Sequence, residues 1–229
     1  MTTTAVPSAY GLTEEHEALR ASVRSFAETV VAPRAAEVDR TAVYPADVHE
    51  ALRKNDLLAL HVPEAYGGAG ADAISTAIVI EELSRVDAST GLIVAVNKLG
   101  TTGLLLSGDD DIKSRYLPAV ASGESTFSYA LSEREAGSDA AAMRTRAVRD
   151  GDAYVLDGTK AWISQAGVST HYTVMAVTEP GAGARGISAF VVHADDPGFS
   201  VGLPEHKMAS RARRPARCTS RPAASPPTA

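Results

Sequence analysis

The feature that most constrains the fold of this 229-residue chain is a change of hydrophobic period near residue 122. Before that point apolar residues recur at helical spacing; after it, segments are short, β-branched and aromatic, and Asp-Gly pairs separate them. A run of helices followed by a run of strands is typical of an α+β fold and does not fit an alternating parallel sheet. We therefore predict an α+β fold, with an all-helical domain over residues 1–121 and a small antiparallel β domain over residues 122–208.

The first expected helix carries one apolar stripe from Leu19 to Val31, with Thr13 as its N-cap. Pro45 is well placed to open a second helix that runs through Leu52. Further helices are predicted over residues 72–85, 89–106 and 110–121. Strands are predicted over residues 126–131, 143–149, 153–156, 172–177, 187–192 and 199–203, with turns at 150–151, 157–158 and 181–183.

Charge and composition exclude several classes of protein. The chain has 22 Lys and Arg against 28 Asp and Glu, a net charge of −6, which argues against a general nucleic-acid or anionic-membrane binder. One cysteine cannot form an internal disulfide, and the six histidines lack metal-ligand spacing, so no metal site is expected. We see no export signal and no apolar run long enough for a membrane span, and we expect a cytoplasmic protein.

The last segment, residues 209–229, differs from the rest of the chain. It holds five arginines, four prolines and the single cysteine, and it has no aromatic, Val, Ile, Leu or Met. Such a segment cannot bury enough apolar surface to offset its ordering entropy, so we predict a disordered basic tail. A nucleic-acid-binding arm is the less favoured interpretation, because no aromatic residue is interleaved with the arginines.

A glycine-rich segment, Gly68-Ala-Gly70-Ala-Asp-Ala73, matches the dinucleotide fingerprint in its GxGxxA form. Taken alone it would indicate a nicotinamide cofactor. However, Pro63-Glu-Ala-Tyr66 separates it from the preceding apolar run, and no βαβ repeat follows. We therefore do not adopt this interpretation.

Two segments carry the chemistry: Tyr129-Ala-Leu-Ser-Glu-Arg-Glu-Ala-Gly-Ser-Asp139 and Gly158-Thr-Lys-Ala-Trp-Ile-Ser164. Both place hydroxyls, small residues and exposed backbone amides at the end of a strand, which suits a polar, planar and partly anionic ligand. From these residues alone, a pair of capped turns explains the pattern equally well, and Trp162 could be a core residue.

With these segments the chain resembles the acyl-CoA dehydrogenase family. Pro63-Glu-Ala-Tyr-Gly-Gly-Ala-Gly70 is similar to a loop in that family's helical domain, and Tyr116-Leu-Pro118 with Ser122-Gly-Glu124 resembles its passage into the β domain. Ser132-Glu-x-x-Ala-Gly-Ser-Asp139 and Lys160-Ala-Trp-Ile-Ser164 resemble its two flavin-contacting motifs, and Lys207-Met208 also fits in order. The resemblance covers residues 12–208 and reassigns the glycine-rich segment to a family loop.

The resemblance implies an FAD enzyme of fatty acid metabolism, which desaturates an acyl-CoA substrate and passes electrons to an electron-transfer flavoprotein. Arg134 and Glu135 stand where the family often has Pro-Gly. Ser138 would also reach the acyl-CoA, and Trp162 and Ser164 would lie beside the flavin ring. The full set of implied cofactor-binding residues is Tyr129, Leu131, Ser132, Gly137, Ser138, Trp162, Ile163 and Ser164.

The resemblance also implies a part that we do not find. Desaturation needs a base opposite the flavin, and in this family the base is a glutamate on a C-terminal helical domain. Nothing after Met208 matches that domain, so we assign no catalytic residue, and we hypothesise that a reading-frame change produced the tail. The family's homotetramer is not expected for such a fragment. A non-catalytic flavin-binding fragment and a relative of the acyl-CoA oxidases or flavin hydroxylases are alternatives.

Overall fold

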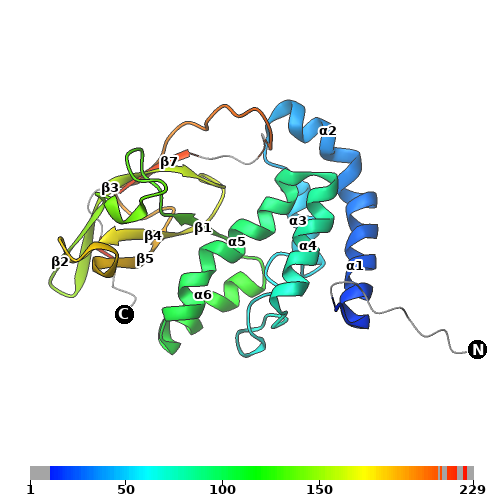
Figure 1. Cartoon of the computed structure of the whole chain (residues 1–229), viewed down its shortest axis with the longest axis horizontal. Helices are drawn as coiled ribbons and strands as arrows, with labels where there is room; N and C mark the ends of the chain where they lie inside the picture. The colour runs from blue at the N-terminus through cyan, green and yellow to red at the C-terminus, as the bar shows by residue number, and fades with distance from the viewer. Residues whose placement is uncertain (1–10, 211, 213–215, 221–223, 226–229) are drawn as a thin grey trace, which may run out of the picture.

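The computed structural model describes residues 11–210, 212, 216–220 and 224–225. Helices form one half of the molecule and a sheet forms the other, and α5 lies where the two halves meet (Figure 1). This arrangement confirms the predicted α+β class. The helices are α1 Glu14–Phe26, α2 Ala32–Thr41, α3 Ala46–Lys54, α4 Ala73–Val86, α5 Ala88–Ser107 and α6 Asp110–Ala121.

The caps of these helices agree with the sequence. The Thr13 side chain accepts a hydrogen bond from the His16 amide and forms a capping box that starts α1. Pro45 precedes α3, as the pattern predicts, and the Asp72 side chain caps α4 at the start of the predicted helix over residues 72–85. The apolar stripe of the first helix instead continues through a π-helical turn, Ala27–Val31, into α2, which the sequence did not indicate as a separate helix. The wider turn keeps both Ala27 and Val31 buried.

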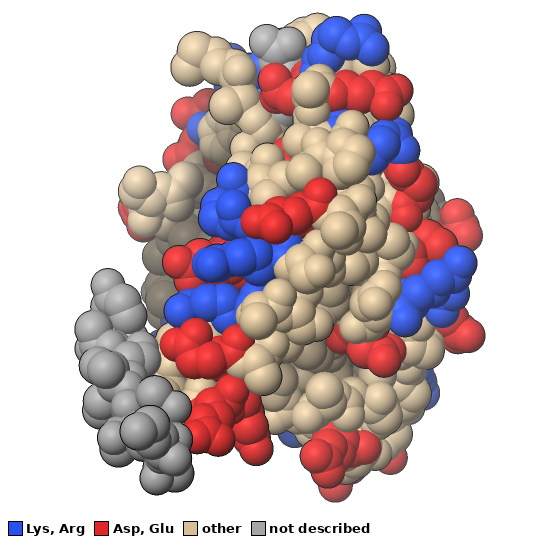
Figure 2. Space-filling view, turned by 90° about the vertical axis from the view of Figure 1, so that its right-hand side faces the viewer, with Lys and Arg blue, Asp and Glu red and all other residues tan. Residues whose placement is uncertain are grey.

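A buried carboxylate joins α1 to α4. The side chain of Glu82 is only 3% exposed and accepts two hydrogen bonds from the Arg24 guanidinium, at 2.7 and 2.9 Å. These bonds, with the Arg24 charge and a further contact from Arg85, lower the pKa of Glu82 against the opposing effect of burial. On this side of the molecule basic and acidic side chains are interspersed over the visible face (Figure 2).

The sheet is mixed. Its strands are β1 Phe127–Ala130, β2 Arg146–Asp150, β3 Ala153–Ile163, β4 His171–Val177, β5 Ile187–His193, β6 Phe199–Val201, β7 Ala216–Ser220 and β8 Ala224–Ser225. The strand order is β1-β4-β2-β3-β7-β6, with β5 also on β4 and β8 also on β3. Most pairs are antiparallel as expected, but β1 and β2 both run parallel to β4. The long connection that contains β2 and β3 permits the β1–β4 pair, because it returns the chain to the same end of the sheet.

Two predictions about the strands need correction. The expected turn at 157–158 is wrong, because β3 continues through it to Ile163 and Asp157 pairs with Arg146 of β2. Within the expected disordered tail, β7 pairs with β3 and β6, and β8 pairs with β3. Strands pair through backbone N–H and C=O groups, which nearly every residue type carries. The composition of these two segments therefore could not exclude strand pairing. Residues 211, 213–215, 221–223 and 226–229 of the tail lie outside the described residues.

Helix α5 packs directly on the sheet through two hydrogen bonds and one close approach at a glycine. The Phe127 amide donates to Asn97 Oδ1 at 2.9 Å, and Thr173 Oγ1 donates to the Gly100 carbonyl at 2.6 Å. A Cβ on Gly100 would lie 2.6 Å from the Phe127 Cβ, so only glycine allows this approach. Among the described residues α5 is the one helix long and apolar enough to cross a membrane, but 56% of that window is buried, as in a protein core.

We expect Gly100→Ala to lower the free energy of unfolding by about 1–3 kcal/mol, because the new methyl group must displace Phe127 or α5. Gly103→Ala is the matched control on the same helix. Its Cβ would meet Thr173 Cγ2 at an ordinary 3.7 Å, and alanine favours the helix by about 1 kcal/mol. Urea denaturation should therefore separate the two variants; equal stabilities would contradict the close approach.

The fold also predicts a pH dependence. His61 is buried and its Nε2 lies 2.7 Å from Thr101 Oγ1. Burial, assisted by the charge of Lys98, lowers the pKa of His61 from 6.5 to about 4. The unfolded chain therefore takes up a proton here at a higher pH than the folded chain, so stability falls as the pH drops from 6.5 towards 4.

His61→Leu should reduce this loss of stability in denaturation curves recorded across that pH range. His206→Leu, at an exposed position, serves as the control and should leave the loss unchanged. A pH profile unaffected by His61→Leu would show that this imidazole is not its source.

Candidate functional site

The first motif forms a closed loop after β1. Leu131 and Ser132 are half-buried, and the backbone amide and carbonyl of Glu133 pair with those of Ala136 at 2.9 and 3.2 Å. Arg134 and Glu135 form the exposed tip of this tight turn. Two charged residues are tolerated at this tip because it lies in solvent.

Gly137 and Ser138 follow this turn and are exposed. The short helix Ala140–Ala142 comes next, and the chain then returns into β2. The hydroxyl of Ser138 and the backbone of Gly137 are therefore open to a ligand approaching from solvent.

The second motif ends strand β3 with a strained aromatic residue. Trp162 has φ +59°, a left-handed backbone that is costly for a bulky side chain, and it is 50% exposed. Its neighbour Ile163 is 2% exposed and packs in the core of the sheet. An aromatic side chain held at the surface by unfavourable backbone geometry is typical of a binding position, and it is not the core residue that the sequence left open.

The loop that follows β3 is fixed on two sides. The Ser164 carbonyl accepts a hydrogen bond from Ser128 Oγ of β1 at 2.7 Å, and Gln165 Nε2 donates to the Leu92 carbonyl of α5 at 3.2 Å. Ser164 itself is half-buried. The backbone of this loop is therefore positioned by both the sheet and the helical half.

The structure brings the two motifs together. The Ala161 amide donates to the Ser132 carbonyl at 2.8 Å, which places the start of the first loop beside Trp162. The carboxyl end of β3 and the loop after β1 are thus joined directly. Ser132, Ser164 and the exposed indole of Trp162 therefore belong to one surface, which suits a planar ligand with hydrogen-bonding edges.

A buried ion pair underlies this edge. Lys160 Nζ lies 2.9 Å from Glu133 Oε1, and their side chains are 2% and 9% exposed. Burial raises the pKa of Glu133, but hydrogen bonds from Thr145, the Arg144 amide and Lys160 outweigh it and lower this pKa to about 2. Burial also lowers the pKa of Lys160, against the opposing effect of Glu133. The carboxylate remains charged over the ordinary pH range.

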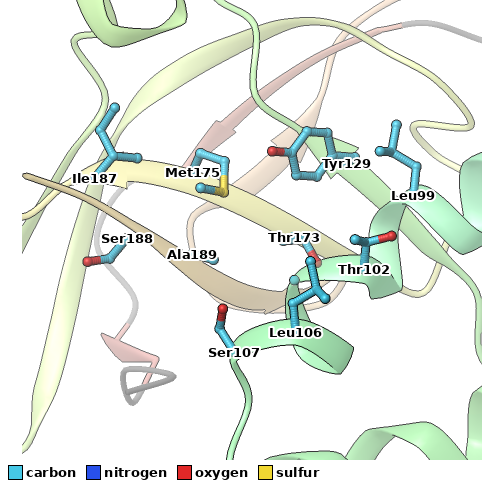
Figure 3. A pocket seen from close by; sticks show the side chains of 11 residues that line it. Leu99, Thr102, Leu106, Ser107, Tyr129, Thr173, Met175, Ile187, Ser188 and Ala189 are labelled. Atoms are coloured by element: carbon cyan, nitrogen blue, oxygen red, sulfur yellow. The ribbon is translucent and has the colours of Figure 1, made fainter. Parts of the chain in front are cut away.

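An apolar cavity of about 400 Å³ lies beside the site, between α5 and the sheet (Figure 3). Of the predicted site residues only Tyr129 lines it, and burial raises the pKa of the Tyr129 hydroxyl. Sequence reasoning missed the residues on the other walls, which are Leu99, Thr102 and Leu106 of α5 and Met175 and Ile187 of β4 and β5. The available signal in the sequence was the pair of leucines Leu99 and Leu106, seven residues apart on one helix and therefore on one face of it; the structure exposes both.

Two other sequence features are resolved by the structure. Within the described residues no group of three or more potential metal ligands occurs. Gly68 and Gly70 lie in a loop after a short 3-10 helix, Glu64–Tyr66, and the Gly70 amide bonds back to the Val62 carbonyl at 2.8 Å. No strand leads into these glycines, so the dinucleotide interpretation does not apply here.

Comparisons with known proteins identify the family. A model of the acyl-CoA dehydrogenase N-terminal domain matches residues 13–124, and a model of the acyl-CoA dehydrogenase middle domain matches residues 128–219. The chain belongs to the acyl-CoA dehydrogenase family. The middle-domain match extends into the predicted tail and includes all but the last residue of β7.

Several of the proteins similar to this chain are named acyl-CoA dehydrogenases. The chain is 57% identical over 199 residues to a probable acyl-CoA dehydrogenase of Mycobacterium tuberculosis, covering 87% of this chain and 51% of that protein. An acyl-CoA dehydrogenase structure from Geobacillus kaustophilus matches with a TM-score of 0.89 at 32% identity, over 96% of this chain and 58% of that one. A glutaryl-CoA dehydrogenase from Mycobacterium smegmatis in complex with FADH2 matches with a TM-score of 0.87 at 29% identity, over 95% and 56%. The chain thus spans about half the length of the curated relatives that it matches.

The strain at Trp162 gives a prediction that is independent of any ligand. Trp162→Gly should be more stable than Trp162→Ala by about 1 kcal/mol, because glycine adopts a left-handed backbone without a Cβ penalty. Both variants lose the same indole, so its lost contacts cancel in the comparison. Thermal or urea denaturation of the two variants measures the difference, and a more stable alanine variant would contradict the strained geometry.

Proposed function

We propose that this chain forms the helical and middle domains of a flavin-dependent acyl-CoA dehydrogenase, which introduces a double bond between adjacent carbons of an acyl-CoA thioester. The observation that carries the proposal is the hydrogen bond between Ala161 and Ser132, because it unites the two motifs beside an exposed indole. The residues present fit FAD. The indole offers a face for a planar ring, and serine hydroxyls and backbone groups offer hydrogen bonds to its polar edge.

Under this proposal each predicted site residue has a role. Trp162 and Ser164 bind beside the flavin ring, and the buried Ile163 holds the backbone between them. Ser138 lies exposed where it can serve both the cofactor and the acyl-CoA. The remaining cofactor-binding positions are Tyr129, Leu131, Ser132 and Gly137, which supply backbone groups, hydroxyls and an open surface.

The chemistry divides between the cofactor and the protein. FAD, when bound, supplies the acceptor for the hydride that leaves the substrate. The chain's own residues bind and orient both molecules and shield them from water. The apolar cavity beside Tyr129 is suited to the acyl chain, because its lining is mostly hydrocarbon.

The rest of the reaction rests on the family resemblance. We place the base that removes the proton next to the thioester carbonyl in the part of the relatives that extends beyond this chain. Transfer of electrons to an electron-transfer flavoprotein, and assembly of the full-length protein as a homotetramer, have the same basis.

Flavin binding and substrate reduction test the proposal separately. The chain has one tryptophan, so FAD bound beside Trp162 should quench its fluorescence, and the complex should show flavin absorption. Anaerobic addition of an acyl-CoA should leave that absorption unchanged, because the base is expected beyond this chain. Absence of both quenching and bound flavin would contradict the flavin site, and bleaching would contradict the location assigned to the base.

A further inference from the structure

We infer that Glu133 and Lys160 are a positioning pair for the flavin site: their buried ion pair fixes the loop after β1 against strand β3. The pair thereby sets where Ser132 and Trp162 stand relative to each other. The inference rests on the proposed function. It adds two residues to which that proposal gives no contact with FAD or acyl-CoA.

The Lys160 ammonium group contacts both ends of the loop. It donates to Glu133 Oε1 at 2.9 Å and to the Leu131 carbonyl at 3.0 Å, next to Ser132. It also lies 3.6 Å from Met143 Sδ, where the loop returns to the sheet. One side chain of β3 therefore holds the loop at its beginning and at its end.

The Glu133 carboxylate completes the closure. Its Oε2 accepts from the Arg144 amide at 2.7 Å, and its Oε1 accepts from the Thr145 amide at 2.9 Å and from Thr145 Oγ1 at 2.5 Å. Both oxygens thus bond the returning chain, and Oε1 also accepts from Lys160. Gly137 and Ser138, the exposed ligand-facing positions, lie between these anchor points.

A close approach of backbones supports the same geometry. A Cβ on Gly158 would lie 2.4 Å from Thr145 Oγ1 and 2.7 Å from Thr145 Cα, so glycine is needed for Thr145 to approach β3 this closely. Gly158 stands two residues before Lys160 on the same strand. Strand and loop are therefore shaped to meet at the ion pair.

Energetics favour a positioning role over a purely stabilising one. Burying two charges costs desolvation energy, and apolar residues of similar volume are often as stable or more stable. Apolar side chains cannot, however, accept the Arg144 and Thr145 amide hydrogen bonds or reach the Leu131 carbonyl. The charged pair fixes the direction of the loop, which hydrophobic packing alone would leave underdetermined.

The first test uses Lys160→Met in the full chain without FAD. Hydrogen exchange followed by mass spectrometry should show amides of residues 132–145 exchanging about tenfold or more faster. Amides of β4 and β5 serve as an internal reference and should be unchanged. Lys54→Met, which removes an exposed lysine 3.6 Å from Glu50, is the matched control and should not affect the loop. Unchanged exchange in the loop of Lys160→Met would overturn the inference.

The second test measures FAD affinity in a variant that avoids an unpaired buried charge. The double variant Glu133→Leu with Lys160→Met should melt at least as high as Lys160→Met alone. Its loop should still exchange fast, and its dissociation constant for FAD should be about tenfold or more above that of the unsubstituted chain. If loop exchange and FAD affinity instead returned to the values of the unsubstituted chain, the inference would be overturned. A stable fold without the ion pair would then be enough to hold the loop and bind FAD.

The two proposals fail differently. If the unsubstituted chain bound no FAD, the proposed function would be contradicted, whereas the exchange comparison without FAD would still decide whether the pair fixes the loop. If FAD bound and the double variant bound it equally well, only the positioning role would be lost.

Discussion

The direct contact of α5 with strand β1 is the constraint on which the rest of the structure depends. Gly100 removes the side chain that would separate helix from strand, and Asn97 uses its amide to bond both the Phe127 amide and the Leu58 carbonyl. The buried amide would be costly if it were unpaired, so it fixes the register of the helix on the sheet. The cavity, Tyr129 and the loop after β3 all take their places from this contact.

Periodicity and caps were enough to predict most of the helices and strands. The stripe of α1, the Thr13 cap and the change of period near residue 122 each act through local geometry that the sequence displays directly. The parallel pairing of β1 with β4 was not predictable in this way, because strand order is set by long-range packing. The extension of β3 past Asp157-Gly158 was missed for a related reason: the glycine serves a close backbone approach, and local turn rules interpret it as a turn.

The candidate site was predictable as two segments but not as one surface. Motif residues such as Ser132 and Trp162 carry recognisable chemistry, yet their adjacency depends on a backbone hydrogen bond that side-chain identity does not reveal. The left-handed conformation of Trp162 likewise follows from the end of β3 and its neighbours, since tryptophan itself disfavours it. Glu133 and Lys160 belonged to the quoted motifs, but only burial and distance distinguish them from surface charges.

The hydrophobic core of the helical half includes Phe127 of β1 and Val191 of β5. The helices therefore do not complete their own core, and two side chains from the sheet finish it. Val191 lies about 165 residues after Phe26, where α1 ends, so these contacts have a large sequence separation and a high loop-closure cost. Folding of the two halves is consequently coupled: the helical half reaches its final packing only when β1 and β5, which both pair with β4, are in place.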